Sequence, residues 1–227
     1  MNYNKNNLKI GGEFMVNIYK IAVVCCLLIG VFTTTALASV ESGYKGNQSK
    51  GYSFAYPIVN TEDKKVAKEI NSDIEKQMLD LEKKIKNHVY SKVDMTYYEK
   101  YEDDNIVSLM FYVNAKAKFT EDIKLNGYTI TYDKHTGERV PMKKYLNISL
   151  EQLQQALNNS RAYAVDGLDN GVNLAKKIPY VSTNYFICHD GSIGLLYQPG
   201  DLMDVKDGAC KIVISPETIN EVNHLNN

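Results

Sequence analysis

The sequence is poor in the residues that build metal and cofactor sites. Its 227 residues include no tryptophan, four cysteines and four histidines. No histidine has a second histidine four residues away, and none has a cysteine at the spacing of a zinc site. Neither a Gly-x-Ser-x-Gly nucleophile elbow nor a phosphate-binding loop is present. We therefore predict no catalytic residues, no metal and no cofactor, and the protein is expected not to be an enzyme.

Neither sign of charge is in excess. The chain has 26 basic and 27 acidic residues, a net charge of −1, and no long block of one sign. Binding to nucleic acid relies on clustered basic side chains, so nucleic acid is not a predicted partner. His189-Asp190 is the one adjacent His–Asp pair in the sequence. It offers a metal ligand or a general base, but its place between two predicted strands favours a structural role in a turn.

One long hydrophobic run stands near the N-terminus. Lys20 precedes an apolar segment over Ile21–Phe32, and Ala36-Leu37-Ala38 follows it. A cationic start, a short apolar run and an A-x-A site are the features of a secretory signal peptide. We predict a signal peptide over residues 15–38, cleavage before Ser39 and a secreted or otherwise extracytoplasmic protein of the cell envelope. The alternative is an uncleaved anchor, for which the run is shorter than the roughly 20 residues that span a bilayer comfortably.

Residues 1–14 are predicted to be an untranslated upstream extension. The codons of Gly11-Gly12-Glu13-Phe14 can read as a ribosome-binding site ahead of a start codon for Met15. N-terminal sequencing of the unprocessed precursor tests this hypothesis, because residues before Met15 would contradict it.

The chain after the signal divides into a flexible lead over residues 39–50 and a single domain over residues 51–227. The lead is rich in serine, glycine and asparagine, which disfavours order. The domain is large enough to bury a core without crosslinks. Its two cysteines, Cys188 and Cys210, can pair as a disulfide outside the cytoplasm. Two buried free thiols are the alternative.

The clearest predicted element is an amphipathic helix from Glu62 to about Lys86. Its apolar residues recur at intervals of three and four, while lysines and glutamates occupy the other faces. Asn60, three residues before Asp63, is the predicted N-cap. The apolar stripe consists of Val66, Ile70, Ile74, Met78, Leu81 and Ile85.

The rest of the domain is predicted to be rich in strands. Residues 52–59 form an edge strand that Pro57 interrupts. Ser149 and Gln152 form a capping box for a second helix, with leucines 150, 153 and 157 toward the core. Since strands and helices are segregated, we predict an α+β fold with helices packed on one face of a mainly antiparallel sheet. Further strands are predicted at 89–101, 106–113, 125–132, 184–188, 193–197 and 211–214.

Tyrosine is abundant, with 17 residues, and six of them fall within predicted strands. Tyrosines on a sheet surface stack on sugars or anchor a protein partner, whereas tyrosines in a core leave only the hydroxyl near solvent. The candidate binding residues are Tyr97, Tyr98, Tyr101, Tyr112, Tyr128 and Tyr132.

Several segments of the domain resemble a known extracytoplasmic family of unknown function. They are Tyr132–Glu138 with Met142–Leu146, Asn184–Ile187 with Asp190-Gly191, Gly208–Ser215, and the helix after Tyr56-Pro57. Together they resemble the outer domain of RsiV-like anti-sigma factors, which binds lysozyme. Related modules precede the catalytic domain of some peptidoglycan deacetylases. In this chain, Asn114–Phe119 and Gln198–Asp201 replace two characteristic loops of that family.

These observations lead us to expect a secreted, non-catalytic binding module of the cell envelope. The resemblance implies that its partner is a lysozyme-like protein or peptidoglycan glycan, with membrane contact only through the signal segment if that segment is uncleaved. A membrane-anchored signalling or sensor protein of the anti-sigma type is an alternative, but residues 1–20 are too few for a cytoplasmic sigma-binding domain. A cell-wall hydrolase or deacetylase is a further alternative, for which the sequence has no catalytic constellation.

Overall fold

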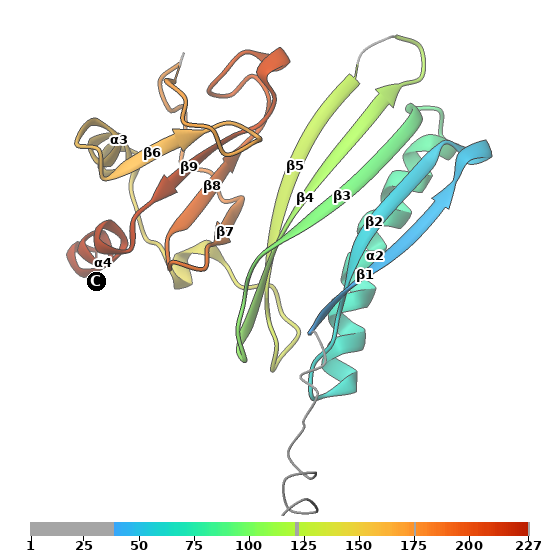
Figure 1. Ribbon diagram of the computed structural model, residues 1–227, viewed down its shortest axis with the longest axis horizontal. Helices are drawn as coiled ribbons and strands as arrows, with labels where there is room; N and C mark the ends of the chain where they lie inside the picture. The colour runs from blue at the N-terminus through green and yellow to red at the C-terminus, as the bar shows by residue number, and fades with distance from the viewer. Residues whose placement is uncertain (1–38, 121–122, 175, 227) are drawn as a thin grey trace, which may run out of the picture. The chain divides into compact units, whose positions relative to one another are not determined.

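The computed structural model describes residues 39–120, 123–174 and 176–226, and in this part of the chain two sheets and three α-helices form an α+β fold (Figure 1). The predicted fold class is confirmed, although two sheets replace the single sheet that we expected. The predictions for residues 1–14 and 15–38 lie outside the described residues. None of the helices in the described part is both long and apolar enough to span a bilayer. The elements are β1 (Val40–Asn47), β2 (Tyr52–Val59), α2 (Lys64–Lys86), β3 (Tyr90–Glu102), β4 (Ile106–Ala117), β5 (Ile123–Asp133), α3 (Leu150–Asn158), β6 (Ala162–Val165), β7 (Tyr185–Ile187), β8 (Ile193–Tyr197), β9 (Cys210–Ile214) and α4 (Pro216–Leu225).

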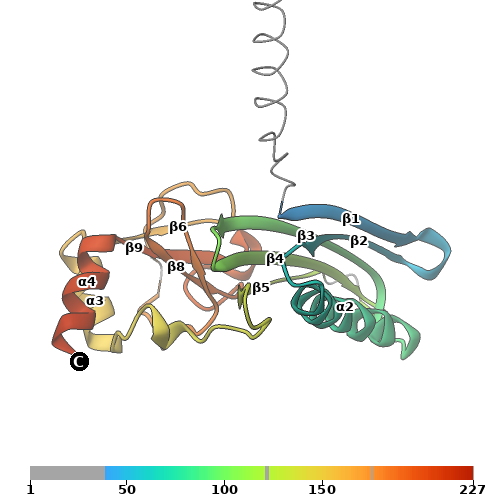
Figure 2. The same cartoon turned by 90° about the horizontal axis from the view of Figure 1, so that it is seen from below.

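The first sheet has the order β1-β2-β3-β4-β5. Its neighbours are antiparallel except β2 and β3, which pair in parallel over three residues. Parallel neighbours require a crossover connection, and α2 provides it between these two strands. Figure 2 shows α2 lying along one face of this sheet.

The predicted stripe of α2 is confirmed as its buried face. Its first five apolar residues are buried against the first sheet, and Ile85 is partly buried there. The N-cap is Asp63, whose carboxylate accepts a hydrogen bond from the Lys65 backbone N–H at 2.7 Å, so Asn60 was wrongly predicted for that role. The sheet residues that meet this stripe include Phe54, Val93, Met95, Leu109, Phe111 and Val113.

The predicted flexible lead is wrong, because Val40–Asn47 forms strand β1 and pairs with β2 along its whole length. This strand lies at the edge of the sheet and most of its side chains are exposed or half-buried. Main-chain hydrogen bonds hold such a strand, so a polar composition does not reveal it. The prediction of β2 as an edge strand is also wrong, because β1 pairs with it and occupies the edge. Pro57 is tolerated there because β2 pairs with β3 only through Tyr52–Phe54.

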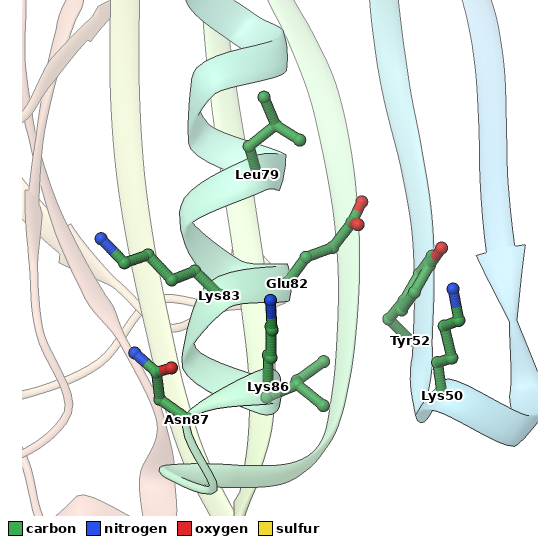
Figure 3. A pocket seen from close by; sticks show the side chains of 8 residues that line it. Lys50, Tyr52, Leu79, Glu82, Lys83, Lys86 and Asn87 are labelled. Atoms are coloured by element: carbon green, nitrogen blue, oxygen red, sulfur yellow. The ribbon is translucent and has the colours of Figure 1, made fainter.

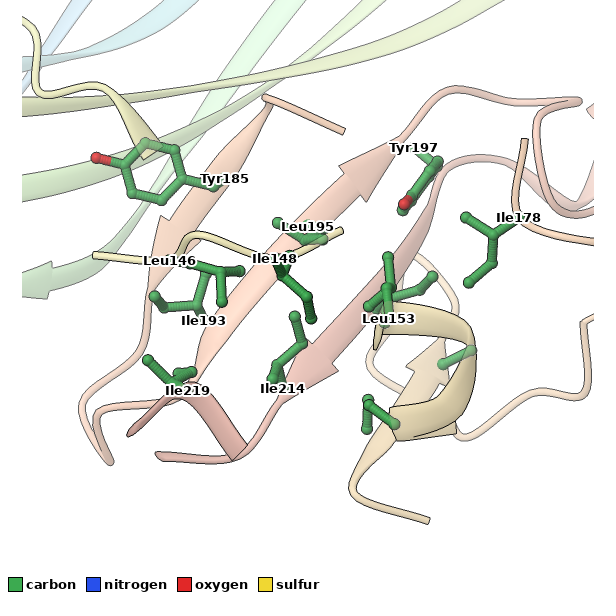
Figure 4. Packing of buried hydrophobic residues seen from close by; sticks show 14 of the residues in the cluster. Leu146, Ile148, Leu153, Ile178, Tyr185, Ile193, Leu195, Tyr197, Ile214 and Ile219 are labelled. Carbon is green, nitrogen blue, oxygen red and sulfur yellow. The ribbon is translucent and has the colours of Figure 1, made fainter. Parts of the chain in front are cut away.

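The second sheet has the order β6-β9-β8-β7 and is antiparallel throughout. Helices α3 and α4 and the segment around Leu146 cover one of its faces, where they enclose the larger hydrophobic core (Figure 4). The capping box of α3 is confirmed, with Ser149 Oγ accepting from the Gln152 backbone N–H at 3.1 Å. Leu153 is buried, but Leu150 is exposed, contrary to prediction. Strand β6 and helix α4 were not predicted.

The two sheets meet through their remaining faces. A small cluster joins Met110 of β4 to Phe186, Leu196 and Ala209 of the second half. Ser108 Oγ accepts a hydrogen bond from the Ile187 backbone N–H at 3.1 Å. The side-chain amide of Gln198 pairs with Gly127, accepting from its N–H at 3.1 Å and donating to its carbonyl at 2.6 Å.

Candidate binding cleft

A cleft of about 740 Å³ opens where the end of the first sheet meets the second half of the domain. Its walls come from the β3–β4 turn, the segment at Tyr145, the β7–β8 turn and one side of α4. This volume is typical of small-molecule and cofactor pockets. The polar and aromatic lining residues are Tyr101, Asp103, Asn105, Lys144, Tyr145, His189, Asp190, Asn220 and Asn223.

Aromatic rings line two sides of the cleft. The centroids of the Tyr101 and His189 rings are 5.8 Å apart, and those of Tyr145 and Tyr185 are 6.4 Å apart. A bulge in β3 between Glu99 and Tyr101 places Tyr101 opposite Ser108 of β4, on the face toward the second sheet. Without that extra residue the alternation of the strand would turn Tyr101 to the other face.

The two carboxylates of the cleft are held by the turns that carry them. Asp103 Oδ1 accepts from the backbone N–H groups of Asn105 and Ile106, both at 2.8 Å, and Tyr101 donates its hydroxyl to Oδ2 at 3.1 Å. Burial alone would raise the pKa of Asp103, but these hydrogen bonds and the nearby charge of Lys134 lower it overall. Both oxygens of this carboxylate are therefore engaged, and the group stays ionised at neutral pH.

Asp190 is engaged in a comparable way at the β7–β8 turn. Its Oδ1 accepts from the Ser192 hydroxyl at 2.6 Å and from the Ser192 backbone N–H at 2.9 Å. The hydroxyl bond and then the backbone bond lower the pKa of Asp190. The predicted turn is confirmed, with Gly191 at a φ of 82°. Here glycine is favoured because other residues rarely adopt that backbone conformation.

Helix α4 contributes amide groups to the opposite wall. Asn223 donates from Nδ2 to the Tyr145 carbonyl at 2.7 Å and accepts at Oδ1 from the Asn147 backbone N–H at 2.9 Å, which fixes this segment beside the cleft. The side chain of Asn220 makes no hydrogen bond to any residue that the structure describes. Sequence reasoning missed these residues because it missed α4. The pair Ser215-Pro216, an N-cap followed by proline at the first helical position, is the signal that could have found it.

The six tyrosines that were predicted as binding residues do not form one surface. Only Tyr101 lines the cleft. Tyr98 and Tyr112 lie against each other with ring centroids 5.8 Å apart, and Tyr98 remains 54% exposed. Tyr112 is half-buried beside the small cluster between the sheets, and burial raises its pKa to about 12.

The other three tyrosines belong to the core beneath α2. Tyr97 and Tyr128 are half-buried there, and Tyr128 stacks on Phe111 with centroids 4.7 Å apart. Tyr132 is fully buried and donates its hydroxyl to Asp73 Oδ2 of α2 at 2.8 Å. Burial and this hydrogen bond raise the pKa of Tyr132. These side chains stabilise the helix–sheet interface, and Tyr132 cannot reach a ligand.

Cys188 and Cys210 are free thiols. The register of the second sheet explains why they do not form the disulfide that the sequence allowed. Cys210 pairs with Tyr197 at one end of β8, whereas Cys188 follows Ile187, which pairs with Ile193 at the other end. Four strand residues span about 13 Å, and a disulfide needs Cα atoms within about 7 Å. Burial raises the pKa of both thiols, that of Cys210 to about 11.

Within residues 39–120, 123–174 and 176–226, no three His, Cys, Asp or Glu side chains are grouped as a metal site would require.

Comparison with known proteins finds similarity at the level of the fold. No family model matches the sequence, and no curated protein matches it. A solved DUF3298 family protein from Pseudomonas aeruginosa PAO1 superposes with a TM-score of 0.54 at 11% identity, covering 81% of this chain and 91% of that chain. A DUF3298 family member from Bacteroides fragilis NCTC 9343 gives a TM-score of 0.49 at the same identity and coverage. The chain thus shares the fold of a DUF3298 family protein.

Proposed function

We propose that this protein is a non-catalytic binding module of the bacterial cell envelope and that its cleft binds a glycan of the peptidoglycan type. The observation that carries the proposal is the combination of Tyr101, His189 and Tyr145 with amide and carboxylate groups around one open cleft. Sugars present apolar faces that stack on aromatic rings and hydroxyl groups that hydrogen-bond to amides and carboxylates. Asn220 is positioned in the wall to take part in such bonds.

Binding without turnover agrees with the state of the two carboxylates. A glycosidase needs one carboxylic acid that stays protonated near neutral pH to donate a proton to the leaving group. The pKa values of Asp103 and Asp190 are both lowered, and neighbouring groups hold both oxygens of Asp103 and Oδ1 of Asp190. The same two residues are well suited to accept hydrogen bonds from sugar hydroxyls.

A protein partner is a second candidate, because two tyrosines away from the cleft are exposed. Tyr98 of β3 is 54% exposed and Tyr163 of β6 is 56% exposed. Exposed tyrosines are frequent anchors of protein interfaces. The resemblance to lysozyme-binding domains makes a lysozyme-like protein the partner to test.

Two binding assays on the purified protein separate these candidates. One is co-sedimentation with insoluble peptidoglycan, and the other is a pull-down with purified lysozyme. Tyr101→Ala is expected to weaken peptidoglycan binding about fivefold, which corresponds to about 1 kcal/mol. Tyr98→Ala should leave it unchanged, and Tyr44→Ala on the exposed side of β1 is the matched control.

The opposite pattern supports the protein partner. If Tyr98→Ala abolishes capture of lysozyme while no variant alters sedimentation, the glycan proposal is wrong. Release of sugar or acetate from peptidoglycan by the wild type, but not by His189→Ala, would show that the protein is an enzyme and would contradict the proposal of a non-catalytic module.

A further inference from the structure

A second cleft, of about 830 Å³, lies between the last turns of α2 and the start of β2 (Figure 3). Its lining residues are Lys50, Tyr52, Leu79, Glu82, Lys83, Ile85, Lys86 and Asn87. Tyr52 pairs with Val93 near the start of β3, whereas the candidate binding cleft begins at Tyr101 near the end of that strand. Eight strand residues separate these positions, a distance of about 26 Å, so the two clefts are distinct.

The floor of this cleft is apolar. Ile85 and Tyr52 pack against the core beneath α2, and the ring of Tyr52 stacks on Phe54 with centroids 5.1 Å apart. Leu79 is 48% exposed, although the other leucine of the helix is buried. A half-exposed leucine beside an aromatic ring offers a surface for an apolar chain.

The rim of the cleft is positively charged. Lys50, Lys83 and Lys86 make no ion pair with any residue of the described part of the chain. Glu82 is neutralised by Lys45, whose Nζ lies 2.6 Å from Oε1. Figure 3 shows the three lysines arising from both walls, with Lys83 and Lys86 on the helix and Lys50 beside Tyr52.

A structural role accounts for only part of this charge. Lysines in the last turn of a helix offset a partial negative charge of about half an electron at its C-terminus. Lys84 is also in that turn, where it pairs with Asp80 at 2.8 Å. Lys50 lies outside α2, in the 3-10 turn before β2, so it does not offset the charge at the C-terminus of that helix. A positive excess therefore remains above the apolar floor.

We propose that this cleft binds an amphipathic anion of the lipid class, with a phosphate or carboxylate head on an apolar chain. The lysines of the rim receive the head, and Leu79, Ile85 and Tyr52 receive the chain. A simple polyanion would leave the apolar floor without a contact. A neutral apolar ligand would leave the lysines without a counter-charge. This proposal does not depend on the function that we propose for the candidate binding cleft.

The test is calorimetric titration of the purified protein with dodecyl phosphate below its micelle concentration. Dodecyl maltoside, which has a neutral head, and inorganic phosphate, which has no chain, are the matched probes. Each is expected to bind at least about tenfold more weakly than dodecyl phosphate. Equal binding of dodecyl maltoside would contradict the role of the lysines, and equal binding of inorganic phosphate would contradict the role of the floor.

Variants locate the site. Lys83→Glu with Lys86→Glu is expected to weaken dodecyl phosphate binding about tenfold or more, and Leu79→Ser to weaken it about fivefold. Lys83→Gln with Lys86→Gln serves if the charge reversal disturbs the helix end. Lys65→Glu with Lys68→Glu at the other end of α2 is the control and should stay within about twofold of wild type. Unchanged affinity in the Gln variant, or equal loss in the control, would overturn the proposal.

Discussion

The two sheets of this protein differ in the length and the burial of their strands. Strands β3, β4 and β5 of the first sheet have 11 to 13 residues, and hairpin connections link them in order. Strands of the second sheet have three to five residues, and β8 and β9 are buried at every position. A strand buried on both faces has no alternation to read. Alternation therefore does not distinguish β8 and β9, although strands were predicted at 193–197 and 211–214 and are confirmed there.

The largest effect is expected in the core of the first sheet. Ile74 is 1% exposed in the middle of the α2 stripe. Ile74→Asp places a carboxylate without a partner in that core and is expected to cost about 4 kcal/mol or more of unfolding free energy. Lys76→Asp, on the exposed face two residues away, should change it by less than about 0.5 kcal/mol. Urea denaturation of both variants measures the difference, and equal losses would mean that the stripe is misassigned.

A somewhat smaller effect is expected in the second sheet. Gly194 faces Phe186 across the β7–β8 pair, and an added Cβ would lie 2.0 Å from the buried ring. Gly194→Ala must displace that ring and is expected to cost about 3 kcal/mol. Gly171→Ala is the control, since nothing lies within 4 Å of its added Cβ. Thermal unfolding should separate the two, and similar melting temperatures would show that the sheet interface adapts freely.

The third prediction concerns acid stability of the α2 interface. Burial would raise the pKa of Asp73, but hydrogen bonds from Arg139, at 2.7 Å, and from Tyr132 lower it overall. A lowered folded-state pKa contributes stability that is complete above the unfolded value of 3.8 and is lost as pH falls through the folded value. The advantage of wild type over Asp73→Asn, about 1 kcal/mol at pH 7, should therefore shrink as pH falls below 3.8 and through the folded-state pKa. An advantage that stays constant throughout acid titration would contradict this assignment.

The smallest effect is an expected absence of change. Because Cys188 and Cys210 are free thiols at opposite ends of β8, dithiothreitol should shift the melting temperature by less than about 1 °C. Cys188→Ser should be equally insensitive to the reductant. A drop of several degrees in the melting temperature of wild type alone would indicate a disulfide and would contradict the register of the second sheet.

The elements that could be predicted are those whose physical cause is local. The stripe of α2, the capping box at Ser149 and the turn at Asp190-Gly191 each depend on residues within a few positions of one another. Strand β1 could not be predicted, since its stability comes from pairing with β2 and none of its side chains is fully buried.

The candidate cleft shows the same limit. Tyr101 was among the predicted binding residues, but its companions Tyr145, Asn220 and Asn223 come from segments 40 or more positions further along the chain. The bulge in β3 decides which way Tyr101 faces, and no spacing rule reveals a bulge. The six candidates are all tyrosines of predicted strands, but they lie on different faces of the first sheet. Counting aromatic residues could therefore not separate those of the core from those of the surface.

If the protein is exported as we propose, strand β1 also bears on the order of its maturation and folding. Ser39 is already tied to Asn60, whose backbone N–H donates to the Ser39 carbonyl at 2.6 Å while Ser39 Oγ donates to the Asn60 carbonyl at 3.1 Å. Proteases bind several extended residues on both sides of the bond that they cut. If the signal is removed before Ser39, those residues must still be unpaired when the peptidase acts. Maturation would then come first and closure of β1 onto β2 last, an order that an edge strand permits because no further strand depends on it.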